Sequence, residues 1–261
     1  MSYRFLKGHG TQNDFVLLPD PDESVHGDLS AERVRALCDR RAGLGGDGVL
    51  RAVRQGERWF MDYRNADGSI SEMCGNGIRV FARYLIDHEG ATTPLEVDSR
   101  DGVKTITRAG DDFTVDMGPP EVLAATTVFV DGVPHEALHV SIGNPHAVAF
   151  VDSLDAAGSL LAEPGFNESV YPEGVNVEFV VRRGAHHVAM RVHERGSGET
   201  RSCGTGACAV MVATALADEA PRGTTYRVDV LGGSLEITWT DDDRVLMTGP
   251  AVLVAEGTTD L

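Results

Sequence analysis

Hydrophobic and polar positions follow the same order in two stretches of the chain. The first is residues 60–85, FMDYRNADGSISEMCGNGIRVFARYL, and the second is residues 190–216, MRVHERGSGETRSCGTGACAVMVATAL. Each begins with a short alternating run, which predicts a strand, and continues through a polar, glycine-rich loop. Each then reaches Cys-Gly-x-Gly and an apolar run, which predicts a buried helix.

A second pair of similar segments is also separated by about half the chain. GTQNDFV at 10–16 resembles IGNPHAV at 142–148, with Asn13 and Asn144 just before an apolar stretch. Chance likeness between glycine-rich loops is the alternative. Two pairs of similar segments, each separated by about half the chain, favour an internal repeat. Setting Cys74 on Cys203 then places Asn65 against Glu194.

The remaining pattern predicts short strands in an α+β fold, with each half wrapping its strands around one apolar helix. Turns at 108–111 and 240–243 favour antiparallel hairpins over a parallel sheet. Pro119 and Pro120 block both a helix and a central strand, so we expect halves at 1–119 and 120–261. The predicted strands are 94–99, 103–108, 112–117, 138–142, 146–151, 175–182, 226–231, 234–239 and 244–248.

Length, net charge and cysteine count limit the classes of partner and the cellular location that we expect. The 261 residues suffice for one large domain or two small ones. A net charge of −17 argues against nucleic acid and anionic membranes as partners. No apolar run reaches the ~18 residues of a membrane span, and the N-terminus does not resemble a signal peptide, so we expect a cytoplasmic protein. Its four cysteines should then be thiols, and because none forms a CxxC pair, no structural metal is expected.

The two Cys-Gly-x-Gly loops carry the candidate chemistry. The first N–H groups of a helix lack partners and, with the helix dipole, form an anion site. Such a site is expected to lower the pKa of Cys74 and of Cys203. If the halves face each other, one thiolate could remove an α-proton from a small anionic ligand while the other thiol delivers a proton to the opposite face. This predicts inversion of a stereocentre.

Simpler interpretations exist for each cysteine, because a buried, inert thiol is common. We assign that interpretation to Cys38, within a helical pattern, and to Cys208, inside the second apolar run. Two cysteines in matching loops are harder to explain in this way. A protein that only binds an anionic ligand is the non-enzymatic alternative, and exchange of solvent hydrogen into a substrate would distinguish the two.

Cofactor motifs are weak. GLGGDG at 43–48 follows a helix and precedes a strand, so we interpret it as a turn, and GTGACA at 204–209 follows a polar loop. Pyridoxal chemistry needs a Schiff-base lysine, yet only Lys7 and Lys104 exist, and Lys104 is expected on a hairpin strand. We therefore expect no cofactor.

At these residues the sequence resembles the diaminopimelate epimerase family. The resemblance spans nearly the whole chain and is carried by GTQNDFV, RNADGSISEMCGNGIRVFARY, GNPHAV, VNVEF and HERGSGETRSCGTGACA. It implies interconversion of LL- and meso-diaminopimelate, a diamino-dicarboxylate, for lysine and peptidoglycan synthesis. It also implies two pseudo-symmetric domains with the site in the cleft between them, and a C-terminal end of about ten residues that packs on the first half. The oligomeric state is not fixed by the sequence; a homodimer is one candidate.

The resemblance also implies roles for individual residues. Cys74 and Cys203 would be the acid/base pair, with His146 and Glu194 near the reacting amine as modulators of the thiols. The backbone of the two loops would hold the reacting carboxylate. The residues implied to contact the substrate are Asn13, Asn65, Gly75, Asn76, Asn144, Asn176, Glu194, Arg195, Gly204 and Thr205.

Some of these residues have structural explanations. Asn65 could hold a turn before Ala-Asp-Gly, and His146 could be a core histidine. Asn176, in a strand otherwise apolar on both faces, is harder to explain structurally. One position departs from the family: many members carry glutamine where this chain has Gly48. Among relatives of this fold, proline racemase has CGHG at the first loop, where this chain has CGNG with Asn76. The branch of phenazine biosynthesis lacks the thiol pair.

Overall fold

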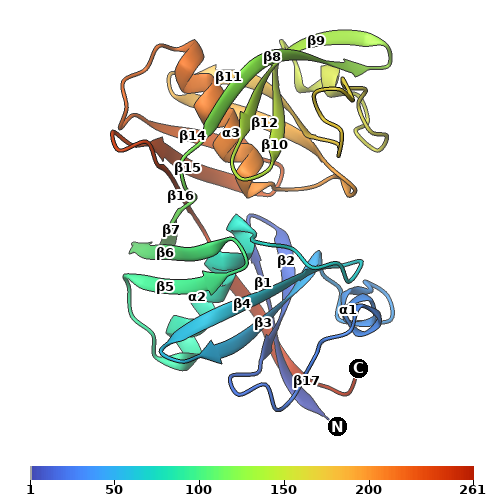
Figure 1. Cartoon of the computed structure of the whole chain (residues 1–261), viewed down its shortest axis with the longest axis vertical. Coiled ribbons are helices and arrows are strands. Elements are labelled where there is room, and N and C mark those ends of the chain that lie inside the picture. The colour runs from blue at the N-terminus through green and yellow to red at the C-terminus, as the bar shows by residue number, and fades with distance from the viewer. Residues whose placement is uncertain (1) are drawn as a thin grey trace. The chain divides into compact units, whose positions relative to one another are not determined.

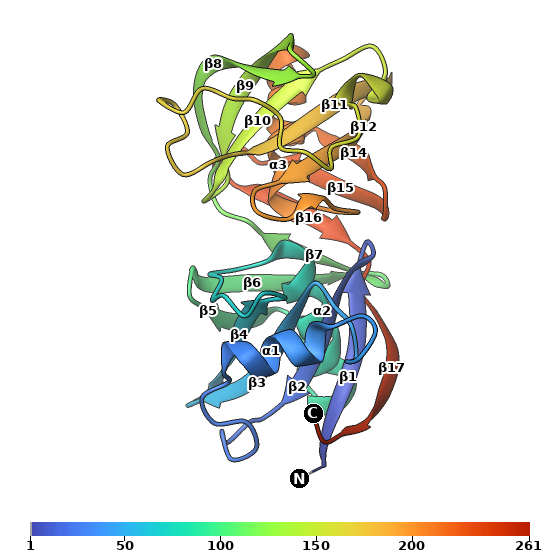
Figure 2. The same ribbon diagram turned by 90° about the vertical axis from the view of Figure 1, so that its right-hand side faces the viewer.

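The computed structural model describes residues 2–261 and divides the chain into two compact units. The first unit comprises the chain up to Val115 together with Gly249–Leu261, and the second is Asp116–Thr248. Each unit combines a mixed sheet with one long helix, as Figures 1 and 2 show. This confirms the predicted α+β class, with few helices and many short strands.

In the first unit the strands lie in the order β17-β1-β2-β3-β4-β5-β6-β7. Neighbours are antiparallel except β2–β3 and β4–β5. A short helix, α1 (Ala31–Cys38), follows β2 and begins at the N-cap Ser30. The strand bounds are β1 Tyr3–Gly10, β2 Asn13–Pro19, β3 Gly48–Gln55, β4 Arg58–Asn65, β5 Leu95–Ser99, β6 Gly102–Ala109, β7 Asp112–Asp116 and β17 Val252–Thr259.

In the second unit the order is β8-β9-β10-β11-β12-β14-β15-β16, with β13 paired to the end of β12. The parallel neighbours are β10–β11 and β12–β14. A 3-10 turn, η1 (Leu154–Ala157), follows β10. The strand bounds are β8 Glu121–Val130, β9 Val133–Ser141, β10 Pro145–Phe150, β11 Asn176–Gly184, β12 His187–Glu194, β13 Gly198–Glu199, β14 Thr225–Val230, β15 Gly233–Trp239 and β16 Val245–Gly249.

The central helices are α2 (Gly75–Glu89) and α3 (Gly204–Ala217). Helix α3 is apolar on nearly every side, which is the pattern of a helix buried all round. It packs against β9, β10 and β11 and also against β14 and β15 (Figure 1). Helix α2 contacts β1, β2, β3, β4 and β17 in the same manner. Each sheet therefore encloses its own helix, as the hydrophobic pattern predicts.

The predicted hairpins are confirmed: β6 and β7 pair around the turn at 108–111, and β15 and β16 around 240–243. Most neighbouring strands are antiparallel, as expected, and a few pairs are parallel. Parallel neighbours need a long crossover, and such segments exist between β2 and β3, where α1 lies, and between β10 and β11, where η1 lies. Strand β8 was not predicted, because most of its residues are exposed and it lacks a buried face.

Among residues 2–261, no helix combines the length and the apolar character needed to cross a membrane.

Candidate active site

Both cysteines of the matching loops lie at helix starts, as predicted. Cys74 is the N-cap of α2, with φ −139° and ψ 120°, and its Sγ accepts the Gly77 N–H at 3.4 Å. Cys203 is the N-cap of α3, with φ −113° and ψ 117°, and its Sγ accepts the Gly206 N–H at 3.3 Å. Because the first N–H groups of a helix lack intrahelical partners, each sulfur lies beside backbone donors that point out of the helix start.

Space at the second glycine of each loop is limited, and more so in the second loop. A Cβ on Gly77 would lie 3.2 Å from Leu50 Cδ2 and 3.4 Å from Phe15 Cζ. A Cβ on Gly206 would lie 2.6 Å from Glu178 Oε1 and 3.2 Å from the Cys203 Sγ. Neither glycine has a positive φ, so close packing, and not a special turn conformation, explains why both positions lack a side chain.

In the first unit, Asn13 and Asn76 meet at Cys74. The Cys74 thiol donates to Asn13 Oδ1 at 3.5 Å, and Asn76 Nδ2 donates to the same oxygen at 3.2 Å. Asn76 is fully buried, and its Oδ1 accepts from Arg79 at 2.9 Å and from Thr11 at 3.3 Å. The surroundings of Cys74 are therefore built from neutral amides with fixed orientations.

Asn65, at the end of β4, makes local contacts. Its Nδ2 donates to Ser69 Oγ at 3.0 Å, and its backbone N–H donates to the Ser69 carbonyl at 3.0 Å. Gly68 N–H closes the turn on the Asn65 carbonyl at 2.9 Å. The turn-holding interpretation of Asn65 is thus confirmed, whether or not it has a second role toward a ligand.

In the second unit, carboxyl groups surround the thiol. Burial raises the pKa of Cys203 well above its usual value, and the negative charges of Glu194 and then Glu178 raise it further. Hydrogen bonds from Thr205, 3.5 Å away, and from the Gly206 N–H act in the opposite direction but are weaker. The expectation that the helix start lowers the pKa of Cys203 was therefore wrong: in this loop, desolvation and like charge outweigh the helix dipole.

Glu194 ends β12 beside this thiol. Burial raises the pKa of its carboxyl, while hydrogen bonds from Thr200 and Cys203 counteract the shift. The Thr200 hydroxyl donates to Glu194 Oε1. A carboxyl with a raised pKa next to a thiol with a raised pKa makes a proton-holding pair.

His146 is completely buried at the start of β10. Its Nδ1 lies 2.7 Å from Glu178 Oε1 and its Nε2 lies 3.0 Å from Asn144 Oδ1. Both ring nitrogens therefore have a polar partner within the unit. The structure brings the predicted residues His146 and Asn144 together and adds Glu178, which was not predicted.

Asn176 ties two strand ends together. Its Nδ2 donates to the Pro145 carbonyl at 3.0 Å, and its Oδ1 accepts the Arg195 backbone N–H at 3.0 Å. The Arg195 side chain donates to the Glu173 carbonyl at 3.1 Å through Nη1. Among residues 2–261 its other guanidinium nitrogens have no ion-pair partner, and such a donor fork suits a carboxylate.

Strand register in the first unit sets Phe15, Gly48 and Asn65 in one row. Phe15 is the partner of Gly48 across β2–β3, and Gly48 is the partner of Asn65 across β3–β4. A Cβ on Gly48 would lie 2.5 Å from the Arg64 carbonyl and 2.7 Å from Tyr63 Cε2. In this chain, position 48 therefore has no room for a side chain, which agrees with glycine in place of the glutamine expected from the family resemblance.

The second unit repeats this row. His146 is the partner of Asn176 across β10–β11, and Val177 is the partner of His193 across β11–β12. Since β11 and β12 are antiparallel, Asn176 comes beside Glu194, one residue beyond His193. Asn65 and Glu194 therefore occupy equivalent places, as the alignment of the two cysteines predicts.

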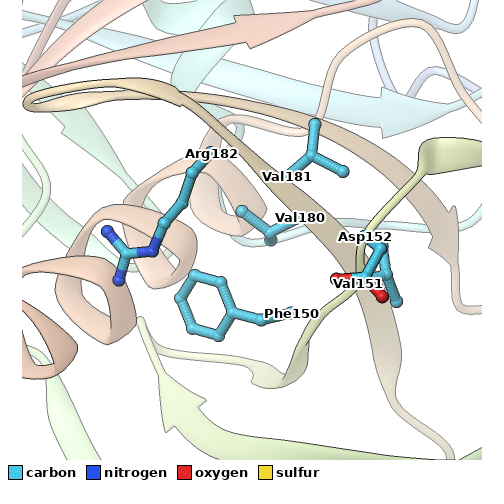
Figure 3. Close-up of a pocket in the computed structure, with 6 residues that line it drawn as sticks. All are labelled: Phe150, Val151, Asp152, Val180, Val181 and Arg182. Atoms are coloured by element: carbon cyan, nitrogen blue, oxygen red, sulfur yellow. The ribbon is translucent and has the colours of Figure 1, made fainter.

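Two surface pockets involve none of the predicted site residues. One, of about 380 Å³, lies at the C-terminal end of β10, the end opposite His146. Figure 3 shows Arg182 beside Phe150 in it, with the guanidinium carbon 5.4 Å from the ring centre. The other, of about 590 Å³, lies beside Tyr3 and Leu261. Neither pocket is lined by a cysteine or by another residue of the predicted site, so the cysteine loops remain the candidate site.

Comparison with known proteins shows the family of the chain. The family model for diaminopimelate epimerase matches residues 5–123 and 138–254. A diaminopimelate epimerase of Streptomyces coelicolor is 58% identical over 98% of this chain and 95% of that protein, and one of Rhodococcus jostii is 44% identical over 98% and 96%. The chain belongs to the diaminopimelate epimerase family.

Solved structures extend the likeness of fold beyond the diaminopimelate epimerase family. A phenazine biosynthesis protein of Bacillus anthracis aligns with a TM-score of 0.73 at 14% identity, over all of both chains. A hydroxyproline epimerase of Agrobacterium vitis aligns with a TM-score of 0.70 at 14% identity, over 99% of this chain and 92% of that one. At such identities the likeness concerns the fold.

Several side chains that hold the site were not predicted, although the family resemblance covers their segments. Asp47 accepts from Asn13 Nδ2 at 2.7 Å. Arg79, fully buried, donates to Asn76 and to the Gly75 and Pro250 carbonyls. A signal existed for Arg79 and for Glu178, since each is a charged residue inside an apolar run.

Proposed function

We propose that this chain interconverts LL- and meso-2,6-diaminopimelate by two-base proton transfer at the α-carbon, with Cys74 and Cys203 as the two bases and no cofactor. Membership of the diaminopimelate epimerase family supports the substrate. The observation that carries the mechanism is that each half presents a cysteine as the N-cap of its central helix. The reaction would serve lysine and peptidoglycan precursor synthesis.

In the proposed reaction one proton leaves the substrate α-carbon and another proton is added to the same carbon. One cysteine, as thiolate, takes the α-proton, and the electron pair of the C–H bond passes into the carboxylate. The other cysteine, as thiol, gives its proton to the opposite face of the same carbon. The enzyme ends with the thiolate and thiol exchanged, so the reverse reaction uses the same two groups in opposite roles.

The charge that develops on the carboxylate needs donors that are already in place. We assign this role to the backbone N–H groups of Gly75 and Asn76 in one loop and Gly204 and Thr205 in the other. Preorganised donors aimed at developing charge supply a large share of catalytic acceleration. Proton transfer by positioned groups gives about 10²–10⁴-fold, so this electrostatic contribution is needed as well.

The raised pKa of Cys203 supports an order of events. A thiol that resists ionisation is suited to be the proton donor in the resting enzyme, which leaves Cys74 as the first base. Glu194, which exchanges a hydrogen bond with Cys203, is suited to hold the proton that this thiol gains or gives up. His146 and Glu194 would lie near the reacting amine.

The remaining contacts would read the rest of a substrate with two amino-acid ends. Arg195 suits the distal carboxylate through its donor fork. Asparagine side chains both donate and accept, so Asn13, Asn65, Asn144 and Asn176 suit the recognition of an amino-acid centre by its stereochemistry. Asn76 stands where proline racemases have the histidine of CGHG, so this loop differs from theirs.

One assay tests the proposal. LL-diaminopimelate and L-proline are offered separately, and the stereochemistry of each is followed by chiral chromatography. We expect conversion of the first to a mixture with the meso form and no change in the second, in enzyme dialysed against a chelator. Racemisation of proline, or activity that returns only when a metal or pyridoxal phosphate is added, would contradict the proposal.

A further inference from the structure

A buried carboxyl group, Glu178 on β11, lies beside the Cys203 loop and has no role in the mechanism above. Its side chain is fully buried, and Oε1 lies 2.7 Å from Nδ1 of His146, which is fully buried as well. Its other oxygen, Oε2, is buried without a hydrogen-bond partner among residues 2–261. A carboxyl left half-satisfied in the interior costs stability, so packing alone does not account for it.

The first unit fills the equivalent place with apolar side chains. Because Gly48 corresponds to Asn176 in the matching rows, Leu50, two residues further on β3, corresponds to Glu178. In the same register Phe15 corresponds to His146. Leu50 and Phe15 are both fully buried. A hydrophobic pair in one unit is therefore a carboxyl–imidazole pair in the other.

The glycines of the two loops give an independent check of this correspondence. A Cβ on Gly77 would touch Leu50 Cδ2 at 3.2 Å, and a Cβ on Gly206 would touch Glu178 Oε1 at 2.6 Å. Leu50 and Glu178 thus lie beneath the first turn of their respective helices. Both Oε1 and the Cys203 Sγ lie within 3.2 Å of the point where a Gly206 Cβ would be, so the two atoms are no more than about 6 Å apart.

The comparison of the two units separates fold from function. The first unit shows that this architecture closes around a leucine and a phenylalanine. Replacing a buried polar pair by apolar residues of similar volume is often neutral or stabilising. The fold therefore does not require Glu178 and His146, and their presence calls for a functional explanation.

The contacts of His146 suggest that explanation. When Nδ1–H donates to Glu178, Nε2 of a neutral ring is an acceptor. It then pairs with the Asn144 side-chain amide, 3.0 Å away, with that amide turned to present Nδ2 in place of Oδ1. The tautomer and orientation of a histidine are set by the partner of its other nitrogen. A carboxylate that orients an imidazole in this way is the arrangement of hydrolase triads. Glu178, His146 and Asn144 thus form one connected chain.

We propose that Glu178 is a positioning residue of this active site: it accepts the Nδ1–H of His146 and so fixes the ring that holds Asn144 toward the substrate. This rests on the proposed function, in which His146 and Asn144 contact diaminopimelate. The group also faces the thiol. Glu194 from β12 and Glu178 from β11 both raise the pKa of Cys203, and His146 from β10 interacts with Glu194.

The test compares three changes. Glu178→Leu installs the residue of the first unit and leaves Nδ1 of His146 without its partner. Glu178→Gln keeps an oxygen that can accept the Nδ1–H. The double change Glu178→Leu with His146→Phe installs the complete apolar pair of the first unit. Leu50→Met is the matched control, because it alters the equivalent position beside Cys74 and conserves volume.

Three quantities are measured: kcat/KM on LL-diaminopimelate, the thermal midpoint of unfolding, and the ¹⁵N shifts of the two ring nitrogens of His146. We expect Glu178→Leu to lower kcat/KM by about 10- to 100-fold and to move both ring shifts. Glu178→Gln should retain the Nδ1–H and most of the activity. The double variant should unfold at the wild-type temperature or above it, yet stay as inactive as Glu178→Leu. Leu50→Met should leave the ring shifts and the activity unchanged.

Three results would overturn the proposal. Glu178→Leu could keep wild-type kcat/KM, or it could leave the ring shifts of His146 where they are. The double variant could also lose as much thermal stability as Glu178→Leu, which would show that the pair serves the fold. If the wild-type enzyme does not act on diaminopimelate at all, the proposed function fails, and the ¹⁵N shifts still decide whether Glu178 positions His146.

Discussion

The Cys74 and Cys203 loops have the same backbone and different surroundings. In each, a cysteine caps a helix, accepts an N–H three residues ahead and packs against a glycine at which a Cβ would be crowded. Around Cys74 the neighbours are asparagine amides and apolar side chains. Around Cys203 they are Glu194 and Glu178, which raise its pKa.

This difference shows how a repeated fold can carry an asymmetric reaction. Two identical thiols would ionise together, and a pair of thiolates or a pair of thiols cannot pass a proton through a substrate. In the proposed mechanism, Glu194 and Glu178 keep the Cys203 thiol protonated, and Cys74 acts as the first base. The repeat supplies two equivalent helix starts, and a few substitutions between the halves supply the difference.

The largest effect is expected from removing either sulfur. Cys74→Ala and Cys203→Ala should each lower epimerisation by about 10³-fold or more, because both bases are needed for inversion. Chiral chromatography of the products measures this. Cys208→Ala, within the same helix as Cys203, and Cys38→Ala are the controls, and full activity in either active-loop variant would refute the two-thiol mechanism.

The next largest effect concerns the carboxyl beside Cys203. Glu194→Gln removes the largest charge that raises the pKa of this thiol. A raised pKa keeps the proton on sulfur as pH increases, so without Glu194 the thiolate forms at lower pH. The alkylation of Cys203 by iodoacetamide is measured against pH in the Cys74→Ala variant, and adding Glu194→Gln should shift its midpoint downward. In enzyme that keeps both cysteines, Glu194→Gln should lower kcat about 10-fold or more.

Glu199→Gln is the matched control, since Glu199 is a nearby carboxyl bound to Arg191 at 2.6 Å. Its alkylation midpoint should equal that of the parent. An unchanged midpoint in Glu194→Gln would remove Glu194 from the account of the asymmetry.

A smaller effect, on stability, is expected at the fifth residue after each cysteine. Arg79 in α2 is buried and holds the Gly75 and Pro250 carbonyls and Asn76, whereas Cys208 takes that place in α3. Arg79→Met should lower the free energy of unfolding by about 3 kcal/mol, because it leaves several buried acceptors unpaired. Cys208→Ala should cost about 1 kcal/mol. Urea unfolding measures both, and equal losses would contradict the comparison.

The smallest effect is expected from filling the glycine positions. Gly206→Ala places a Cβ 2.6 Å from a carboxyl oxygen, and Gly77→Ala places one 3.2 Å from a leucine methyl. The first should lower the free energy of unfolding by about 1–3 kcal/mol and the second by less than about 1 kcal/mol. Reversed values would show that the packing beneath the two helices is not as described.

The sequence predicts much of this molecule because strong local signals coincide. The alternating runs, the glycine-rich loops and the two apolar helices sit where the pattern places them, and the equivalence of Asn65 and Glu194 agrees with strand register. The parallel pairs β2–β3 and β10–β11 could not be predicted in the same way, because the partner of a strand across a long crossover leaves no local pattern.

Residues that act on other site residues were the hardest to predict. The pKa of Cys203 depends on Glu194 and Glu178, which lie on different strands from the cysteine, so a helix start considered alone gives the wrong direction. Asp47 lies 34 residues from Asn13, which it orients. Glu178 is recognisable in the sequence only as a charge in an apolar strand. Its contact with His146 is made by the side chains, since the register of β10 with β11 pairs Glu178 with Val148.

Isotope exchange during the first few turnovers tests the central claim most directly. LL-diaminopimelate is incubated with enzyme in deuterium oxide, and the α-deuterium of substrate and product is measured separately by mass spectrometry. Two thiols acting from opposite faces predict one solvent deuterium in nearly every meso product molecule and little in the remaining LL substrate. Equal deuterium in both pools from the start would indicate a single base that serves both faces, and would contradict the assignment of distinct roles to Cys74 and Cys203.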